Sequence, residues 1–137
     1  MKTKKDIENE RTKLISGITN QLTLLVDDLQ KQKPEKAFTI HVYEENMYWC
    51  VNWESTKLWK TDQFLKEYFQ VQIWKSSEKY SLEGEHRVED IFEHLSDQYF
   101  LYEGMTIQDL ILMTDEIVEK TRAGVLEAVD KEIDSSY

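Results

Sequence analysis

Two residues of this chain, His41 and Cys50, could support nucleophilic chemistry if they lie side by side. An imidazole can take the proton of a neighbouring thiol, and the resulting thiolate is a nucleophile. The alternation of apolar and polar residues around them places the two on opposite strands of one hairpin, facing each other. However, a cysteine in the middle of a strand is shielded, and no glycine-rich turn or helix N-terminus presents it. We therefore expect a buried, slowly reacting thiol and no catalytic residue.

The residue types that bind metals and phosphates lack the required spacing. Asp90 and His94 are four residues apart, as two ligands on one helix face would be. Three scattered histidines and a single cysteine nevertheless do not form a zinc motif, and a surface pair on a helix is the simpler interpretation. Isolated glycines lie beside acidic residues, which would repel a phosphate. We expect no metal site and no cofactor.

The segment that positions His41 and Cys50, residues 37–53, has the clearest strand pattern of the chain. A turn at Glu45 and Asn46 would define the register of the two strands. One face of the hairpin is then wholly apolar and must be buried; it holds Phe38, Ile40, Val42, Trp49, Val51 and Trp53. The other face is aromatic and partly polar, and it is an alternative face for ligand binding; it holds His41, Tyr43, Tyr48 and Cys50.

Long helices are expected towards both ends of the chain. Residues 4–32 carry apolar side chains every three or four positions, begin with Thr3 and Asp6 in a capping box, and end at a proline. Thr106 and Asp109 repeat the capping pattern, and a second apolar stripe predicts one helix that continues to about residue 134.

The middle of the chain has weaker signals. Residues 61–69 suggest a short helix, residues 69–75 alternate as a third strand would, and residues 76–87 have the composition of a loop. Residues 87–100 suggest a further helix, because a helical spacing would group Val88, Ile91, Phe92 and Leu95 on one side.

Together these elements predict an α+β fold in a single domain, residues 1–137. A small antiparallel sheet would pack against the long N- and C-terminal helices and one or two shorter helices. Two helices of this length exceed what a three-stranded sheet can cover. Part of their apolar surface should therefore meet other helices, within the chain or across a homodimer.

Charge is distributed unevenly along the chain, whose formal net charge is −10. Residues 1–75 carry 12 Lys and Arg against 11 Asp and Glu, whereas residues 76–137 carry 5 against 16. An acidic surface repels the phosphates of nucleic acids and attracts basic proteins, although solubility alone is the simpler explanation. The chain has neither a charged-then-apolar leader nor the roughly 20 apolar residues of a membrane span. We expect a cytoplasmic protein without membrane contacts.

These features favour a non-enzymatic interaction protein. We expect it to be an inhibitor, immunity protein, antitoxin or phage-type anti-defence protein. Such a protein would use its acidic surface to bind and block a basic toxin, nuclease or other nucleic-acid-binding protein. The predicted contacts are acidic residues outside the apolar stripes of the second half, with two tyrosines as anchors: Glu85, Glu89, Asp90, Glu93, Asp97, Tyr99, Tyr102, Glu103, Asp115, Glu116 and Glu119. Two alternatives stay open. One is a small-ligand or minor enzymatic domain that uses the face of His41 and Cys50, and the other is a helical assembly subunit.

Overall fold

The computed structural model describes residues 2–55, 66–89 and 94–135. The chain order is helix α1 (Lys4–Gln32), strand β1 (Lys36–Tyr43), a short 3-10 turn η1 (Glu44–Asn46), and strands β2 (Tyr48–Ser55), β3 (Lys66–Ser76), β4 (Lys79–Glu89) and β5 (His94–Met105). Helices α2 (Ile107–Leu112) and α3 (Thr114–Ser135) follow. The strands form one antiparallel sheet in the order β1-β2-β3-β4-β5, which confirms the α+β prediction.

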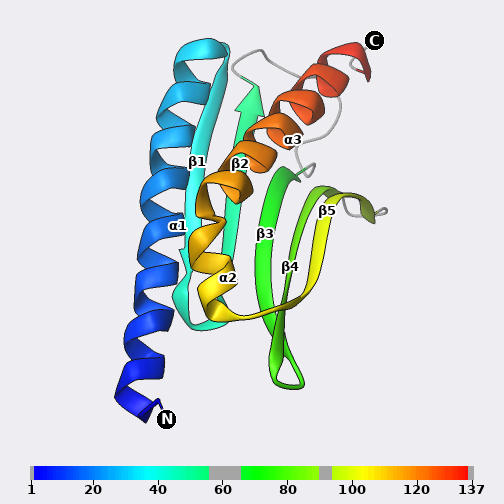
Figure 1. Cartoon of the computed structure of the whole chain (residues 1–137). Coiled ribbons are helices and arrows are strands. Elements are labelled where there is room, and N and C mark those ends of the chain that lie inside the picture. The colour runs from blue at the N-terminus through cyan, green and yellow to red at the C-terminus, as the bar shows by residue number, and fades with distance from the viewer. Residues whose placement is uncertain (1, 56–65, 90–93, 136–137) are drawn as a thin grey trace.

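The three helices cover one face of this sheet (Figure 1). Helix α1 lies along β1 and contacts both α2 and α3, while α3 crosses β3, β4 and β5. The core fills the space between the two layers, and its largest buried side chains include Trp49, Phe69, Leu22 and Ile117. Within the described residues no helix packs on the opposite face, which we call the open face of the sheet.

Helix α1 begins and ends where the sequence predicts. The backbone amide of Asp6 donates to Thr3 Oγ1 (3.1 Å), and the amide of Thr3 donates to Asp6 Oδ2 (3.0 Å), so the capping box is complete. The apolar stripe is buried against the sheet and the other helices. After Lys33, Pro34 has no amide hydrogen with which to continue the helix.

The register of the β1–β2 hairpin is also confirmed. Phe38 pairs with Trp53 and His41 pairs with Cys50, and both hairpin tryptophans, Trp49 and Trp53, are buried. The turn differs from the prediction, because residues 44–47 form it and Met47, not Asn46, takes the positive φ of 48°. Met47 is held there by its neighbours: its amide donates to Glu44 O and its carbonyl accepts from the amide of Ile73. A loop with the same centre leaves the register unchanged.

Strands β4 and β5 correct two sequence predictions. Residues 76–87, expected as a loop, lie mostly in β4, and the helix expected over residues 87–100 is replaced by the end of β4 and by β5. The positions of β4 that face the core include Gly84 and His86, which are not apolar side chains. The sequence of β4 therefore does not show the apolar alternation that would predict a strand. The ring of Phe100 occupies the space beside Gly84, and the two residues are too far apart in the sequence for a local pattern to predict this contact. Val88 and Leu95 pair with each other across β4 and β5, while Ile91 and Phe92 lie outside the described residues.

Two further differences concern the short elements. Residues 66–69 of the helix expected over 61–69 belong to strand β3, and the rest lie outside the described residues. The single C-terminal helix is interrupted at Met113, between α2 and α3, although no proline or glycine marks the break. Its predicted start is confirmed by the capping box of Thr106 and Asp109. No described helix has the length and apolarity needed to cross a membrane.

Candidate functional site

The open face of the sheet brings residues from four strands into one row. Pairing sets His41 beside Cys50, Cys50 beside Gln70, and Gln70 beside Glu85. Side chains alternate along a strand, so these residues project away from the face on which Trp49 and its neighbours are buried. The predicted ligand-binding face of the hairpin therefore continues across β3 to an acidic residue of the second half.

Hydrogen bonds connect this surface. Tyr48 Oη donates to Gln70 Oε1 (2.5 Å), Gln70 Nε2 donates to Glu85 Oε1 (2.6 Å), and Arg87 Nη1 donates to the same oxygen (3.1 Å). Gln70 is buried although no described helix covers this face. Burial raises the pKa of the Tyr48 hydroxyl, and its hydrogen bond with Cys50 raises it further, so this group is a neutral donor. The chain of bonds holds Tyr48, Gln70 and Glu85 in fixed positions.

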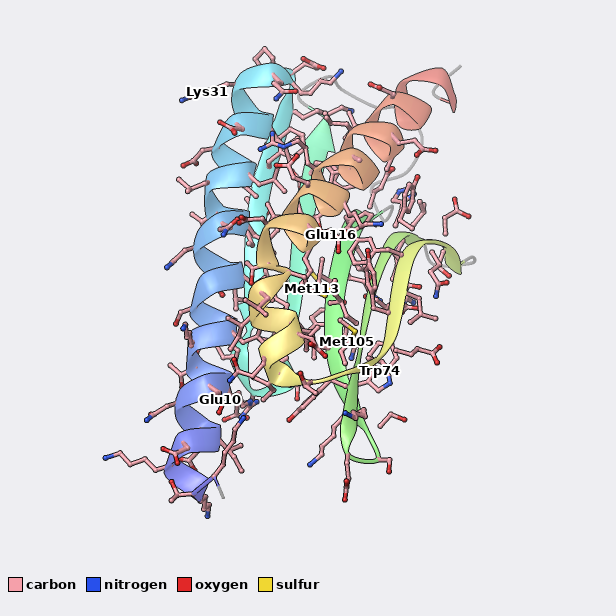
Figure 2. All side chains as sticks on the ribbon, in the orientation of Figure 1. Glu10, Lys31, Trp74, Met105, Met113 and Glu116 are labelled. Carbon is pink, nitrogen blue, oxygen red and sulfur yellow. The ribbon has the colours of Figure 1, made fainter. Side chains whose placement is uncertain are left out.

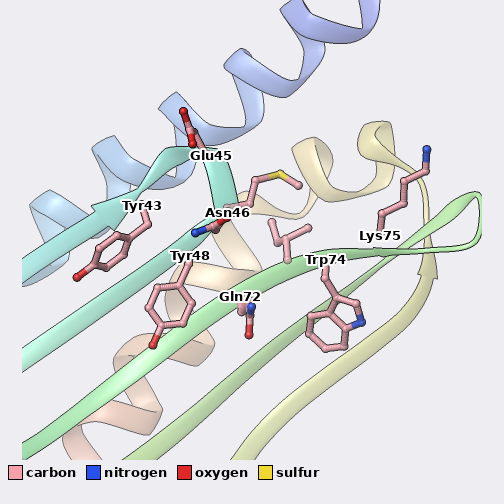
Figure 3. Close-up of a pocket in the computed structure, with 9 residues that line it drawn as sticks. Tyr43, Glu45, Asn46, Tyr48, Gln72, Trp74 and Lys75 are labelled. Carbon is pink, nitrogen blue, oxygen red and sulfur yellow. The ribbon is translucent and has the colours of Figure 1, made fainter.

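Two hollows flank a pair of tyrosines on this face. The rings of Tyr43 and Tyr48 lie 5.5 Å apart at 55° and form a ridge that lines both hollows. The first, which we call the Trp74 hollow, has a volume of about 580 Å³ and includes Gln72 and Trp74. In Figure 3, Tyr43, Tyr48, Gln72 and Trp74 point to the same side, whereas Lys75 points away from them.

The second hollow, which we call the Glu67 hollow, has a volume of about 600 Å³. It extends from the paired part of β2 past the end of β2–β3 pairing, which runs from Tyr48–Gln72 to Asn52–Tyr68. Its lining joins the predicted hairpin face to residues beyond the paired region: Ala37, Thr39, His41, Tyr43, Tyr48, Cys50, Asn52, Trp53, Glu54, Glu67 and Tyr68. All four residues of the predicted alternative face therefore line one cavity.

Glu67 is held by a buried histidine. Its Oε1 lies 2.8 Å from His86 Nε2, and the His86 ring stacks on Trp53 with 5.8 Å between ring centroids and 20° between planes. These three residues come from β3, β4 and β2, and the sequence analysis did not single out Glu67. The alternating pattern of 69–75 stops short of Glu67, so no local signal marked it.

Cys50 and His41 face each other as predicted, but their surroundings differ. Cys50 is only 8% exposed and interacts with the Tyr48 hydroxyl, whereas His41 is exposed. A neutral phenol is a poor base for a thiol. The geometry is that of a small buried side chain beside a hydrogen-bonding network.

The predicted acidic contacts are spread over several surfaces. Glu85 lies on the open face, whereas Asp115, Glu116 and Glu119 are exposed on α3, in the helical layer on the other side of the sheet (Figure 2). Asp97 and Glu103 are exposed on β5, which forms one edge of the sheet. Glu89 is the last residue of β4, and Asp90 and Glu93 lie outside the described residues.

The two predicted tyrosine anchors pack at the margin of the core. The ring of Tyr99 meets Phe69 edge-on at 5.5 Å, and Tyr102 lies 6.1 Å from Phe100. Both are partly buried, so exposed aromatic area is offered instead by Tyr43, which is 51% exposed, and Trp74, which is 36% exposed.

Metal ligation has no support in the described part of the chain. No group of three His, Cys, Asp or Glu side chains is arranged there to hold an ion. His94 begins strand β5 and not a helix, and Asp90, the other member of the predicted pair, lies outside the described residues. Comparisons of the chain with protein-family profiles, curated proteins and solved structures found no match.

Proposed function

We propose that this chain is a non-enzymatic interaction module that binds a basic partner protein through the open face of its sheet. One observation carries the proposal: the hydrogen bonds from Tyr48 through Gln70 to Glu85 join the aromatic hairpin face and the acidic second half into one surface. Two features that are separate in the sequence thereby act on the same ligand.

Aromatic side chains on this face suit a protein partner. Tyr43 and Trp74 present large, partly apolar rings to solvent, and both line the Trp74 hollow beside Tyr48 of the polar network. Tyrosine and tryptophan are frequent anchors of protein interfaces, because they bury much area at a small cost in conformational entropy. The hollows beside the tyrosine ridge provide room for side chains of the partner.

The charge of the face favours a basic partner. Its described residues include Glu54, Glu83 and Glu85, against Arg87, which already forms an ion pair with Glu85. The net charge of −10 adds long-range attraction for a cationic protein and repulsion for nucleic acid. Inhibitors, immunity proteins, antitoxins and anti-defence proteins that block a basic toxin or nuclease act through surfaces of this type.

A test compares two charge reversals that change the net charge equally. Glu54→Lys with Glu83→Lys alters the open face, and Glu116→Lys with Glu119→Lys alters the helical layer. Binding is measured by biolayer interferometry with disordered peptides of equal length and strongly positive, zero or strongly negative charge, at low and high salt. Urea unfolding of each variant checks the fold.

We expect the wild-type chain to prefer the positive peptide, with an association rate that falls as salt rises. The open-face reversal should abolish this preference, whereas the helical-layer reversal should reduce the association rate only modestly. Equal loss in both variants would show that total charge, not the open face, governs binding. Absence of any preference for the positive peptide would contradict a basic partner.

A further inference from the structure

We propose that the Trp74 hollow binds a proline-rich segment of the partner in the polyproline II conformation, with basic residues beside the prolines. This inference rests on the proposed function and specifies which kind of chain segment the open face receives. The hollow combines aromatic rings, hydrogen-bond donors that have no partner among the described residues, and a carboxylate. Each of these features is complementary to one property of such a segment.

Aromatic rings form the walls of the hollow. Strand alternation places Tyr48 and Trp74 on the open face, because their neighbours along each strand are buried in the core. Tyr48 pairs with Gln72, which is two residues from Trp74 on β3, and Figure 3 shows the Gln72 side chain between the two rings. Tyr43 extends the wall, with its ring 5.5 Å from that of Tyr48. Proline-rich segments dock in grooves lined by aromatic rings in this way.

Three donors of the hollow have no hydrogen-bond partner in the part of the chain that the structure describes: Trp74 Nε1, Gln72 Nε2 and Tyr43 Oη. A polyproline II segment forms no internal hydrogen bonds, so its carbonyl groups can accept from these donors. The carbonyls of a helix are already bonded within the helix. An added strand would need the backbone of a sheet edge, which the side chains on a sheet face do not provide.

The rim of the hollow is fixed before a ligand binds. Arg11 of α1 donates from Nη2 to the carbonyl oxygens of Glu44 and Glu45 in the turn η1. The same turn is tied to β3, because the amide of Ile73 donates to Met47 O (3.0 Å). A site whose groups are already in place loses little conformational entropy on binding.

Charge favours basic residues beside the prolines. Glu45 is exposed and lines the hollow, and Glu83 pairs with Gln72 on the open face. Lys75 also belongs to the lining, but its side chain points away from the rings in Figure 3. A second copy of this chain is a poor occupant, because the chain has one proline and a net charge of −10. The segment therefore belongs to a different, basic protein.

The hollow lies at the end of the sheet where η1 joins β1 to β2 and where β3 turns into β4. The strand ends that border the undescribed segments lie at the opposite end, where Lys36 pairs with Ser55 and Lys66 pairs with Glu89. The rings, donors and carboxylates that carry the inference are all described residues.

The test uses three peptides of equal length and equal positive charge: one rich in proline, one with glycine at each proline position, and one with alanine there. Each is titrated into the full-length chain and followed by the indole N–H signals of the tryptophans in two-dimensional NMR. The Trp74→Phe variant identifies the signal of Trp74. Trp49 is the internal reference, because its buried indole N–H donates to Thr19 Oγ1 (2.9 Å).

We expect the proline-rich peptide to bind about tenfold more tightly than the glycine peptide, because proline restricts the free peptide to the bound conformation. The indole signal of Trp74 should shift and that of Trp49 should not. Trp74→Ala should weaken binding about tenfold, and Gln72→Met, which removes the donor and keeps the length of the side chain, about threefold. Leu112→Ala is the matched control, because Leu112 is exposed in the helical layer, and it should leave the affinity unchanged. Urea unfolding checks the fold of each variant.

The results that would overturn the inference can be told apart. Equal affinity for the proline-rich and glycine peptides would refute polyproline II recognition, and tightest binding of the alanine peptide would assign the face to a helix. Binding without a shift of the Trp74 signal would place the contact outside the hollow. If none of the three peptides binds although strongly positive disordered peptides do, only the inference fails. If those peptides fail as well, the proposed function fails with it.

Discussion

Replacing Gly124 by alanine should destabilise the protein, although alanine is the better helix former. The residue lies in α3 and faces the sheet, where a Cβ would lie 2.8 Å from Phe69 Cζ and closer still to Cε2. Normal carbon contacts are about 3.5–4.0 Å. Phe69 is fully buried, and its ring is hemmed in by Tyr99 at 5.5 Å and Phe100 at 6.3 Å, so it has little room to move.

The size of the effect follows from two opposing terms. Alanine in place of glycine inside a helix gains about 1 kcal/mol, whereas overpacking a core costs about 1–3 kcal/mol. We therefore expect Gly124→Ala to lower the free energy of unfolding by about 1 kcal/mol. Gly17, in α1, is the matched control, because a Cβ there would have no atom within 4 Å. Gly17→Ala should raise the free energy of unfolding by about 1 kcal/mol.

Urea unfolding followed by circular dichroism measures both variants, and an unchanged m-value would show that the unfolded state is comparable. A second substitution, Phe69→Leu, should reduce the penalty of Gly124→Ala, because it removes the ring atoms that clash; the coupling is read from a double-mutant cycle. Equal stabilisation by the two glycine substitutions would refute the close packing of α3 on Phe69. Equal destabilisation would refute the open surroundings of Gly17.

Two further predictions concern single groups. Cys50 should react slowly with iodoacetamide in the native protein and rapidly after unfolding, since it is buried in mid-strand; fast native alkylation with loss of peptide binding would contradict this. The carboxylates of Asp6 and Asp109 accept hydrogen bonds from the backbone amides of Thr3 and Thr106, and from their hydroxyl groups. These bonds, the backbone ones most, lower the pKa of each carboxyl below its usual 3.8. Their stabilisation is therefore complete above pH 3.8 and is lost as the pH falls through the lower folded-state pKa. The free energy of unfolding of wild type and of Asp109→Asn should consequently differ less in acid than at neutral pH. A difference that stays constant between neutral pH and pH 2 would contradict this prediction.

The open face shows how far the candidate site could be anticipated. The hairpin register placed His41, Tyr43, Tyr48 and Cys50 together, because strand alternation and turn position are local properties. That these residues share a surface with Glu85 depends on the pairing of β2 with β3 and of β3 with β4. From the sequence, the hairpin face and the acidic second half were alternative sites. The register of the sheet places Glu85 on the same surface as the hairpin residues.

Local signals of the sequence determined the start of both helical regions, the hairpin and the burial of its tryptophans, since capping boxes, apolar periodicity and proline act within a few residues. The tertiary structure alone decided that residues 79–89 and 94–105 are strands. Helical spacing of Val88 and Leu95 competed with strand pairing, and pairing prevails because Phe100 fills the space beside Gly84 and Glu67 binds His86. Each of these contacts joins residues more than a dozen positions apart. A short stretch of sequence therefore does not include both residues of a contact that stabilises the strand.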